Sequence, residues 1–144
     1  MFEIREMKMT DYEAVMALWG QSEGLSLKNA DSKENIESYL DRNQGFSFVV
    51  MHASDVIGAV LVGTDGRRGY LQHLAVSKDW RGHGLGRQLV DKATGALAKA
   101  GVEKTHLFVH DDNLNAQHFY EHSGWFARDE VRMFSYNASD NLNV

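Results

Sequence analysis

The sequence predicts a single α/β domain with one mixed, mostly antiparallel sheet of six or seven strands and about four flanking helices. The chain has 144 residues, which is close to the commonest size of one domain. Segments with strand-like alternation of apolar residues are interspersed with segments that have helical spacing. No repeat, low-complexity tract or linker divides the chain. We therefore expect one domain over residues 1–137, followed by a flexible tail over residues 138–144.

The first half of the chain contains three predicted strands and two predicted helices. Residues 2–7 alternate between apolar and charged side chains, as a half-buried strand does. Residues 10–13 and 31–34 each match a capping box, which marks the start of a helix. Strands are expected at 47–52 and 56–64, and the short polar connection between them predicts a hairpin.

The second half is predicted to alternate strands with helices. A turn at 65–69 leads into a strand at 70–76, and the spacing of apolar residues predicts a helix over 84–100. Gly101 is the expected cap at the end of that helix. The remaining predicted elements are a strand at 105–110, a short helix at 114–123, and a closing hairpin of 125–127 with 131–136.

Composition narrows the possible functions. The chain has no cysteine, which excludes disulfides, Cys-ligated zinc and a thiol nucleophile. A net charge of −5 argues against general nucleic-acid binding, which depends on a positive surface. The N-terminus lacks the apolar centre of a signal peptide, and every apolar stretch is far shorter than the ~20 residues that cross a bilayer. We therefore expect a soluble, cytoplasmic protein that binds neither membrane nor nucleic acid.

Three glycines at alternate positions, Gly82, Gly84 and Gly86, lie between a predicted strand and a predicted helix. Glycine lets the backbone approach a ligand closely, and the first turn of a helix offers unpaired N–H groups that suit phosphate. Arg81 and Arg87 flank the loop and can add charge-assisted bonds. The loop lacks the Gly-Lys-Ser/Thr ending of a P-loop and the third glycine of the dinucleotide fingerprint. A tight turn with a purely mechanical role is the alternative.

Two segments resemble motifs of the GNAT family of N-acetyltransferases. Residues 81–86, Arg-Gly-His-Gly-Leu-Gly, fit that family's phosphate loop, Arg/Gln-x-x-Gly-x-Gly/Ala. Residues 113–125 resemble the family's later pattern Asn-x-x-Ala-x-x-Phe-Tyr-x-x-x-Gly-Phe. The order of the elements also agrees over nearly the whole chain. Two departures are Lys78, where the family often has proline, and Trp125, where phenylalanine is common.

This resemblance implies transfer of an acetyl group from acetyl-coenzyme A to a primary amine of a small molecule or peptide by direct attack, without a metal. The strand at 74–76 would bond the pantetheine arm as an added strand does, and the N–H of Leu74 or a near neighbour would polarise the thioester carbonyl. The loop would hold the pyrophosphate, and a homodimer is expected from the resemblance. The implied cofactor-binding residues are Leu74, Ala75, Val76, Arg81, Gly82, His83, Gly84, Leu85, Gly86, Arg87 and Asn113.

The resemblance also implies catalytic residues. Tyr120 matches the tyrosine of the later motif and would act as the general acid for the leaving thiolate, because a phenol is still protonated at neutral pH. The alternative is a buried aromatic side chain with a packing role. His73 and His110 lie on the two strands expected to splay around the thioester, and either could serve as the base or position a water. The alternative for each histidine is a structural role.

The acceptor site is the least determined part of the sequence. Trp19, Glu23 and Asp31 are candidates because they lie in or near the predicted early helices, where this family binds its acceptors. Acidic residues would suit a cationic amine, whereas Arg67 and Arg68 in the turn at 65–69 would suit an acidic one. Exposed loop charges without a ligand are the alternative for each.

Two rival functions are compatible with parts of the sequence. His118 and His122 belong to a literal His-x-x-Glu-His pattern, which is a zinc-peptidase signature, although no third ligand is evident. The same fold could also serve as a non-catalytic acetyl-coenzyme-A sensor or interaction module, because fold does not determine function.

Overall fold

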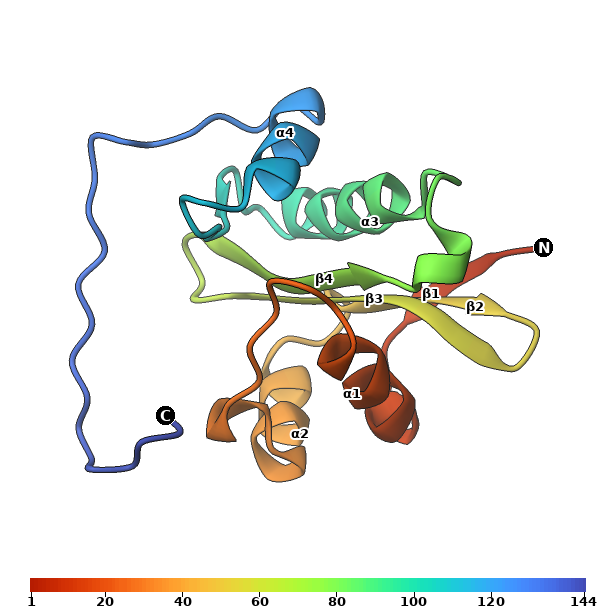
Figure 1. Cartoon of the computed structure of the whole chain (residues 1–144), viewed down its shortest axis with the longest axis horizontal. Coiled ribbons are helices and arrows are strands. Elements are labelled where there is room, and N and C mark those ends of the chain that lie inside the picture. The colour runs from red at the N-terminus through yellow and green to blue at the C-terminus, as the bar shows by residue number, and fades with distance from the viewer.

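The computed structural model describes residues 1–144 and shows one five-stranded sheet between two pairs of helices (Figure 1). The strands are β1 (Glu3–Glu6), β2 (Phe48–His52), β3 (Asp55–Thr64), β4 (Gly69–Val76) and β5 (Thr105–His106). The helices are α1 (Tyr12–Gly20), α2 (Lys33–Arg42), α3 (Leu85–Lys99) and α4 (Leu114–His122). Three short 3-10 turns are η1 (Met9–Asp11), η2 (Asn29–Asp31) and η3 (Lys78–Trp80). None of the helices combines the length and apolar composition that a membrane span requires.

The sheet follows the order of the chain, from β1 to β5. The first four strands pair antiparallel with their neighbours, and β5 pairs parallel with β4. Strand β3 is central and buried on both faces, which suits its run of small and β-branched apolar residues. The mixed, mostly antiparallel sheet and the four helices predicted from the sequence are confirmed.

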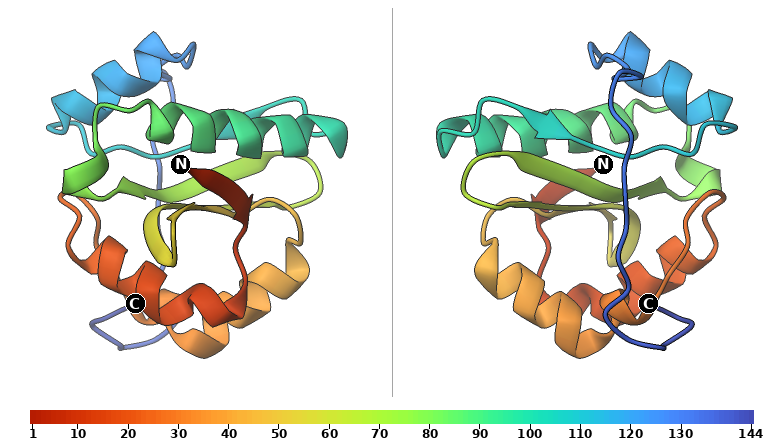
Figure 2. Two further views of the ribbon diagram at one scale, coloured as in Figure 1. Left: turned by 90° about the vertical axis from the view of Figure 1, so that its right-hand side faces the viewer. Right: turned by 90° about the vertical axis from the view of Figure 1, so that its left-hand side faces the viewer.

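Two layers of side chains hold the helices against the sheet (Figure 2). Helices α1 and α2 cover one face, where Trp19 and Ile36 pack with Leu61 of β3. Helix α3 covers the other face, where Leu89 packs with Val60 of β3. Leu89 is fully buried, so truncating it to alanine would cost ~2–5 kcal/mol of stability. Helix α3 is therefore held firmly against the sheet, and it holds the end of the loop that precedes it.

Strands β4 and β5 diverge soon after they meet. Their pairing is restricted to Gly69 with Thr105 and Tyr70 with His106, and the rest of β4 has no neighbour on that side. The predicted strand at 105–110 is therefore too long, because regular pairing ends where β4 turns away. The edge left open runs along Leu74 to Val76, as expected for a site that receives an added strand.

The predicted C-terminal hairpin is wrong, and the sheet has five strands rather than six or seven. Beyond α4 the chain contains no strand, and it runs past the edge of the sheet towards α2 (Figure 1). Its end is held there, because Asn143 accepts a hydrogen bond from the backbone N–H of Asn29 at 2.9 Å and Asn141 donates to the Asn29 side chain at 2.9 Å.

The two predicted capping boxes are also replaced by other contacts. Helix α1 is preceded by Asp11, whose carboxylate bonds Arg5 at 2.8 Å and the N–H of Lys8 at 2.9 Å. Helix α2 is capped by Ser32, which accepts from the N–H of Asn35 at 3.2 Å. Asp31 is thereby left to bond elsewhere.

Candidate functional site

A cavity of about 350 Å³ opens where β4 diverges from β5 and meets the start of α3. Its walls come from β4, from the loop before α3, from α4 and from the connection between α1 and α2. All of the predicted cofactor-binding residues except His83 and Asn113 line it. The full lining is Ser22, Glu23, Leu74, Ala75, Val76, Trp80, Arg81, Gly82, Gly84, Leu85, Gly86, Arg87 and Phe119.

The glycine loop is shaped to receive an anion. Gly82 and Gly84 have φ values of +85° and +74°, a left-handed conformation that side chains disfavour. A Cβ added at either position would meet no atom within 4 Å, so the loop surface is open. Gly84 is the N-cap of α3 and provides no side-chain cap, which leaves the first N–H groups of the helix free for a ligand. These features fit a pyrophosphate.

Cationic side chains surround the loop, and one acidic residue faces them. The guanidinium of Arg81 donates from Nε to the carbonyl of Val76 at 3.1 Å, which orients it beside the cavity. Oε1 of Glu23 lies 3.5 Å from Nζ of Lys78 and 3.9 Å from Nη1 of Arg81. Glu23 therefore lines the cavity beside the loop and lies close to its positive charges.

His73 lies at an irregularity of β4 and is held by Asp31. Its backbone has a φ of +52°, and its Nε2 lies 2.8 Å from Oδ1 of Asp31. The imidazole also contacts the indole of Trp19, with ring centroids 5.0 Å apart. Trp19 is fully buried, and its indole packs against the imidazole of His73.

Helix α4 contributes the opposite wall of the cavity. Phe119 packs over the loop, since a Cβ on Gly86 would meet its ring at 3.4 Å. The ring of Tyr120 packs edge-on against Phe119, with centroids 5.1 Å apart, and lies one ring away from the cavity lining. Burial raises the pKa of Tyr120 to about 12, so its hydroxyl is neutral at physiological pH.

Asn113 is engaged in the start of α4. Its side-chain oxygen accepts from the N–H of Ala116 at 3.2 Å and caps the helix. Its amide nitrogen faces the connection between α1 and α2, because a Cβ on Gly24 would come within 2.9 Å of it. Gly24 and Asn113 therefore meet across the mouth of the cleft.

The other predicted residues lie away from the cavity lining. His110 is exposed beyond the end of β5, and His83 turns its Nδ1 to the carbonyl of Trp80 at 3.0 Å. His122 directs its Nδ1 to the carbonyl of His118 at 2.8 Å, and no group of three His, Cys, Asp or Glu side chains gathers as metal ligands do. The turn at 65–69 is organised by Asp65, which accepts from the N–H groups of the two residues after Gly66.

Three lining residues were absent from the sequence prediction. Phe119 was detectable, because it stands inside the later motif next to Tyr120. Trp80 directly precedes the glycine loop. It belongs to the 3-10 turn η3, which no sequence pattern predicted, so its place in the cavity lining was not predictable. Ser22 belongs to a connection without a motif, and only its folding across the sheet brings it to the cavity.

Solved structures with the same fold include acetyltransferases. The PaiA N-acetyltransferase of Thermoplasma acidophilum, solved with coenzyme A, has a TM-score of 0.80 at 20% identity and matches 90% of this chain and 92% of its own. An aminoglycoside acetyltransferase from an uncultured soil metagenomic sample, solved with sisomicin, has a TM-score of 0.75 at 17% identity and matches 96% of this chain and 97% of its own.

Similarity in sequence supports the same assignment. An acetyltransferase of Pectobacterium atrosepticum is 34% identical over 119 residues, which cover 83% of this chain and 84% of the relative. An acetyltransferase of Sodalis glossinidius is 32% identical over 129 residues, or 90% of each chain. Residues 3–125 match the model of the acetyltransferase (GNAT) family. The open glycine cradle, the diverging strands and these similarities together show that the chain belongs to the acetyltransferase (GNAT) family.

Proposed function

We propose that the protein transfers the acetyl group of acetyl-coenzyme A to a primary amine of a small molecule or peptide by direct attack. The observation that carries this proposal is the cavity, which joins the open edge of β4 to the uncapped start of α3. An extended pantetheine arm suits the first part, and a pyrophosphate suits the second. Acetyl-coenzyme A supplies the acetyl group as a reactive thioester.

The residues of the cleft have distinct roles in this proposal. The N–H groups from Gly82 to Arg87 hold the pyrophosphate, with Arg81 as a charged partner. Backbone groups from Leu74 to Val76 orient the arm, and the N–H of Leu74 or a near neighbour polarises the carbonyl. One such donor contributes ~3 kcal/mol in other acyl-transfer enzymes. Asn113 remains a proposed contact to the cofactor arm through its amide nitrogen.

Tyr120 is proposed to assist departure of the thiol. Its hydroxyl donates a hydrogen bond to the sulfur as negative charge develops there. A pKa of about 12 is higher than that of a thiol, near ~8.5, so complete proton transfer from the phenol is uphill. Tyr120 therefore stabilises the sulfur, and water supplies the proton of the final thiol.

The acceptor is proposed to enter from the side of the α1–α2 connection, where the cleft is open beside Ser22 and Glu23. Several structural neighbours differ in acceptor, for example the aminoglycoside acetyltransferase named above and glucosamine-6-phosphate N-acetyltransferase of Arabidopsis thaliana. A screen should therefore include polyamines, amino acids, aminoglycosides, amino sugars and peptide N-termini.

The proposal is tested by thiol release from acetyl-coenzyme A in the presence of these amines, with mass spectrometry of the products. We expect amine-dependent thiol release and a product about 42 Da heavier than its amine, because an acetyl group replaces a hydrogen. Binding of acetyl-coenzyme A without transfer to any amine would instead support the non-catalytic sensor. Absence of both binding and transfer would contradict the proposal.

A further inference from the structure

Strand β4 carries one extra residue at the position of His73. The register with β3 passes from Ala59 opposite Ala75 to Leu61 opposite Gln72, so two residues of β4 share one partner position. Such a bulge re-aims a side chain and leaves one residue outside the regular ladder. His73 adopts a φ of +52° there, a strained conformation for a residue other than glycine. Strain of this kind persists only where surrounding contacts impose it.

Those contacts come from Asp31 and Trp19, both distant in sequence from the strand. Oδ1 of Asp31 lies 2.8 Å from Nε2 of His73, while Oδ2 accepts from the N–H of Lys28 at 3.0 Å. The hydroxyl of Tyr12 donates to the carbonyl of Asp31 at 2.8 Å, which fixes the residue from the side of α1. The Asp31 side chain is only 8% exposed, so this carboxylate is committed to its partners.

The hydrogen bond to Asp31 determines which ring nitrogen is free. An ionised carboxylate only accepts, so Nε2 of neutral His73 must carry the proton. Nδ1 then has a lone pair. It has no hydrogen-bond partner within the chain, and it is not fully buried. The ring as a whole is 18% exposed.

His73 directly precedes Leu74, the first residue of β4 that lines the cavity. Its side chain lies on the α1–α2 face of the sheet, together with Trp19, whereas Phe119 closes the cavity from the α3–α4 face. An amine entering beside the α1–α2 connection would thus approach the cleft from the face of the sheet that carries the imidazole. His110, by contrast, is exposed beyond β5 and has no orienting carboxylate.

We propose that Asp31 and His73 form a proton-accepting dyad for the acceptor amine, in which His73 is the catalytic base and Asp31 is its positioning residue. This proposal rests on the proposed function. A neutral amine attacks the carbonyl carbon, a C–N bond forms, and the C–S bond breaks with its electron pair passing to sulfur. Nδ1 of His73 takes one proton from the nitrogen and later releases it to water, while the sulfur gains one. The products are an amide and coenzyme A thiol.

The imidazole has one acidic neighbour and one aromatic neighbour, Asp31 and Trp19. Asp31 from η2 faces it directly, and Tyr12 from α1 acts only through the Asp31 carbonyl. Trp19 of α1 and Leu61 of β3 belong to the apolar core on the same face of the sheet.

The dyad is tested with His73→Asn and Asp31→Asn, since asparagine tolerates the left-handed backbone of position 73. With an amine that the wild type acetylates, we expect His73→Asn to lower kcat/KM about 100-fold, on the scale of general-base catalysis. Asp31→Asn should lower kcat/KM about tenfold. Coenzyme A affinity should be unchanged in both.

Asp11→Asn is the matched control. Asp11 is equally buried, ends the other early 3-10 turn, and accepts from the N–H of Lys8 as Asp31 does from Lys28. It bonds Arg5 rather than a histidine, so its substitution should lower stability but leave kcat/KM near the wild-type value. A fall in kcat/KM with all three variants would indicate general loss of folding and overturn the assignment.

Histidine ¹⁵N NMR provides a readout that needs no acceptor. We expect the Nε2–H form of His73 in the wild type and a mixture of tautomers in Asp31→Asn. Wild-type kinetics in His73→Asn, or an unchanged tautomer in Asp31→Asn, would overturn the dyad while leaving the transferase function intact. A wild type that acetylates no amine would overturn the proposed function itself, whatever the tautomer.

Discussion

At the scale of single residues, Tyr120 is the side chain whose proposed role is easiest to isolate. We expect Tyr120→Phe to lower kcat tenfold or more, on the scale of lost acid assistance, with little change in the KM for acetyl-coenzyme A. Tyr39→Phe is the matched control, because burial raises the pKa of Tyr39 to about 12 as well and Tyr39 lies in α2, away from the cavity. Steady-state thiol release measures both. A wild-type kcat in Tyr120→Phe would remove Tyr120 from catalysis.

The same two tyrosines predict how stability depends on alkaline pH. In the unfolded chain their hydroxyls ionise near pH ~10, whereas in the folded protein they stay protonated to about pH 12. Between these values the native state binds more protons than the unfolded state, so the free energy of unfolding falls as pH rises. Urea unfolding at pH 9 and pH 11 should show this fall, and the Tyr39→Phe, Tyr120→Phe double variant should show less of it.

Glu23 yields a third prediction at this scale. It competes with a bound anion for Lys78 and Arg81, so Glu23→Gln should tighten coenzyme A binding. The pair is exposed, which limits the gain to about fivefold or less and makes it salt-dependent. Titration calorimetry at low and high salt measures the effect, with Glu121→Gln on α4 as a control. Weaker binding by Glu23→Gln would show that the residue assists the ligand.

At the scale of elements, the loop and the helix it opens form one functional unit. Gly84 and Gly101 stand at opposite ends of α3, with φ values of +74° and +90° and open space around each added Cβ. Alanine at either position should destabilise the fold by a similar ~1 kcal/mol through backbone strain. Only Gly84→Ala should also weaken coenzyme A binding, by tenfold or more. Equal affinities in the two variants would contradict the cradle.

The sequence alone predicted the helices and strands that depend on local residue patterns. Alternation and spacing predicted β1 to β4 and all four helices, and the glycines of the loop before α3 marked the cavity. Contacts between distant segments were not predictable in this way. Asp31 was expected at a capping box and an acceptor site, but Ser32 caps the helix, and Asp31 instead forms a hydrogen bond with His73 at the bulge of β4. A bulge depends on how two strands pair, so the residue pattern of one strand alone does not predict it.

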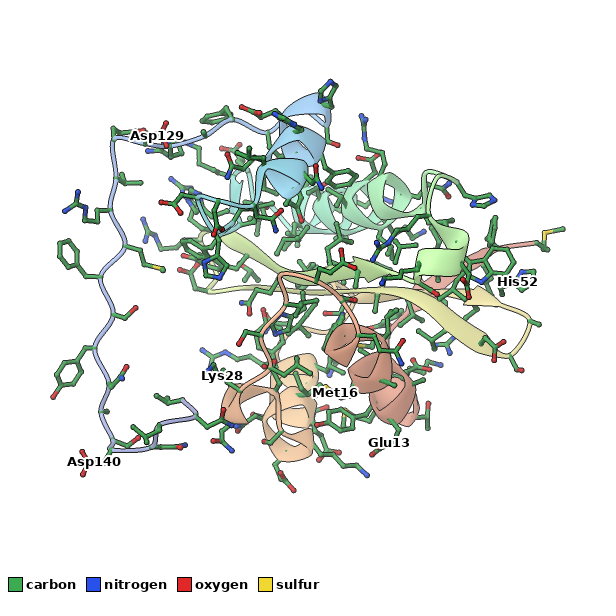
Figure 3. The ribbon with its side chains drawn as sticks, in the orientation of Figure 1. Glu13, Met16, Lys28, His52, Asp129 and Asp140 are labelled. Atoms are coloured by element: carbon green, nitrogen blue, oxygen red, sulfur yellow. The ribbon has the colours of Figure 1, made fainter.

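At the scale of the whole molecule, the C-terminal segment differs from the rest. Figure 3 shows the side chains between Asp129 and Asp140 standing away from the body. They include Phe134 and Tyr136, which are 87% and 91% exposed. Apolar alternation at 131–136 predicted a strand, but alternation cannot specify a partner strand, and none lies alongside. The homodimer expected from the family resemblance stays a prediction.

Hydrogen exchange tests this description of the segment. Among amides 126–136, only the N–H of Val131 donates to a backbone carbonyl, that of Arg128. These amides should therefore exchange rapidly at micromolar protein concentration. Amides of β3 should be strongly protected and serve as the internal reference. Slow exchange over 126–136 would instead place that segment in a sheet, within one chain or between two copies.

The central claim is that the loop from Arg81 to Arg87 holds the pyrophosphate of coenzyme A beside the open edge of β4. The most direct test is calorimetric titration of the wild-type protein with coenzyme A and, separately, with pantetheine, which lacks the pyrophosphate and nucleotide. Charge-assisted bonds to phosphate are about twice as strong as neutral ones, so coenzyme A should bind at least 100-fold more tightly than pantetheine. Equal affinities for the two ligands, or no binding of coenzyme A, would contradict the account.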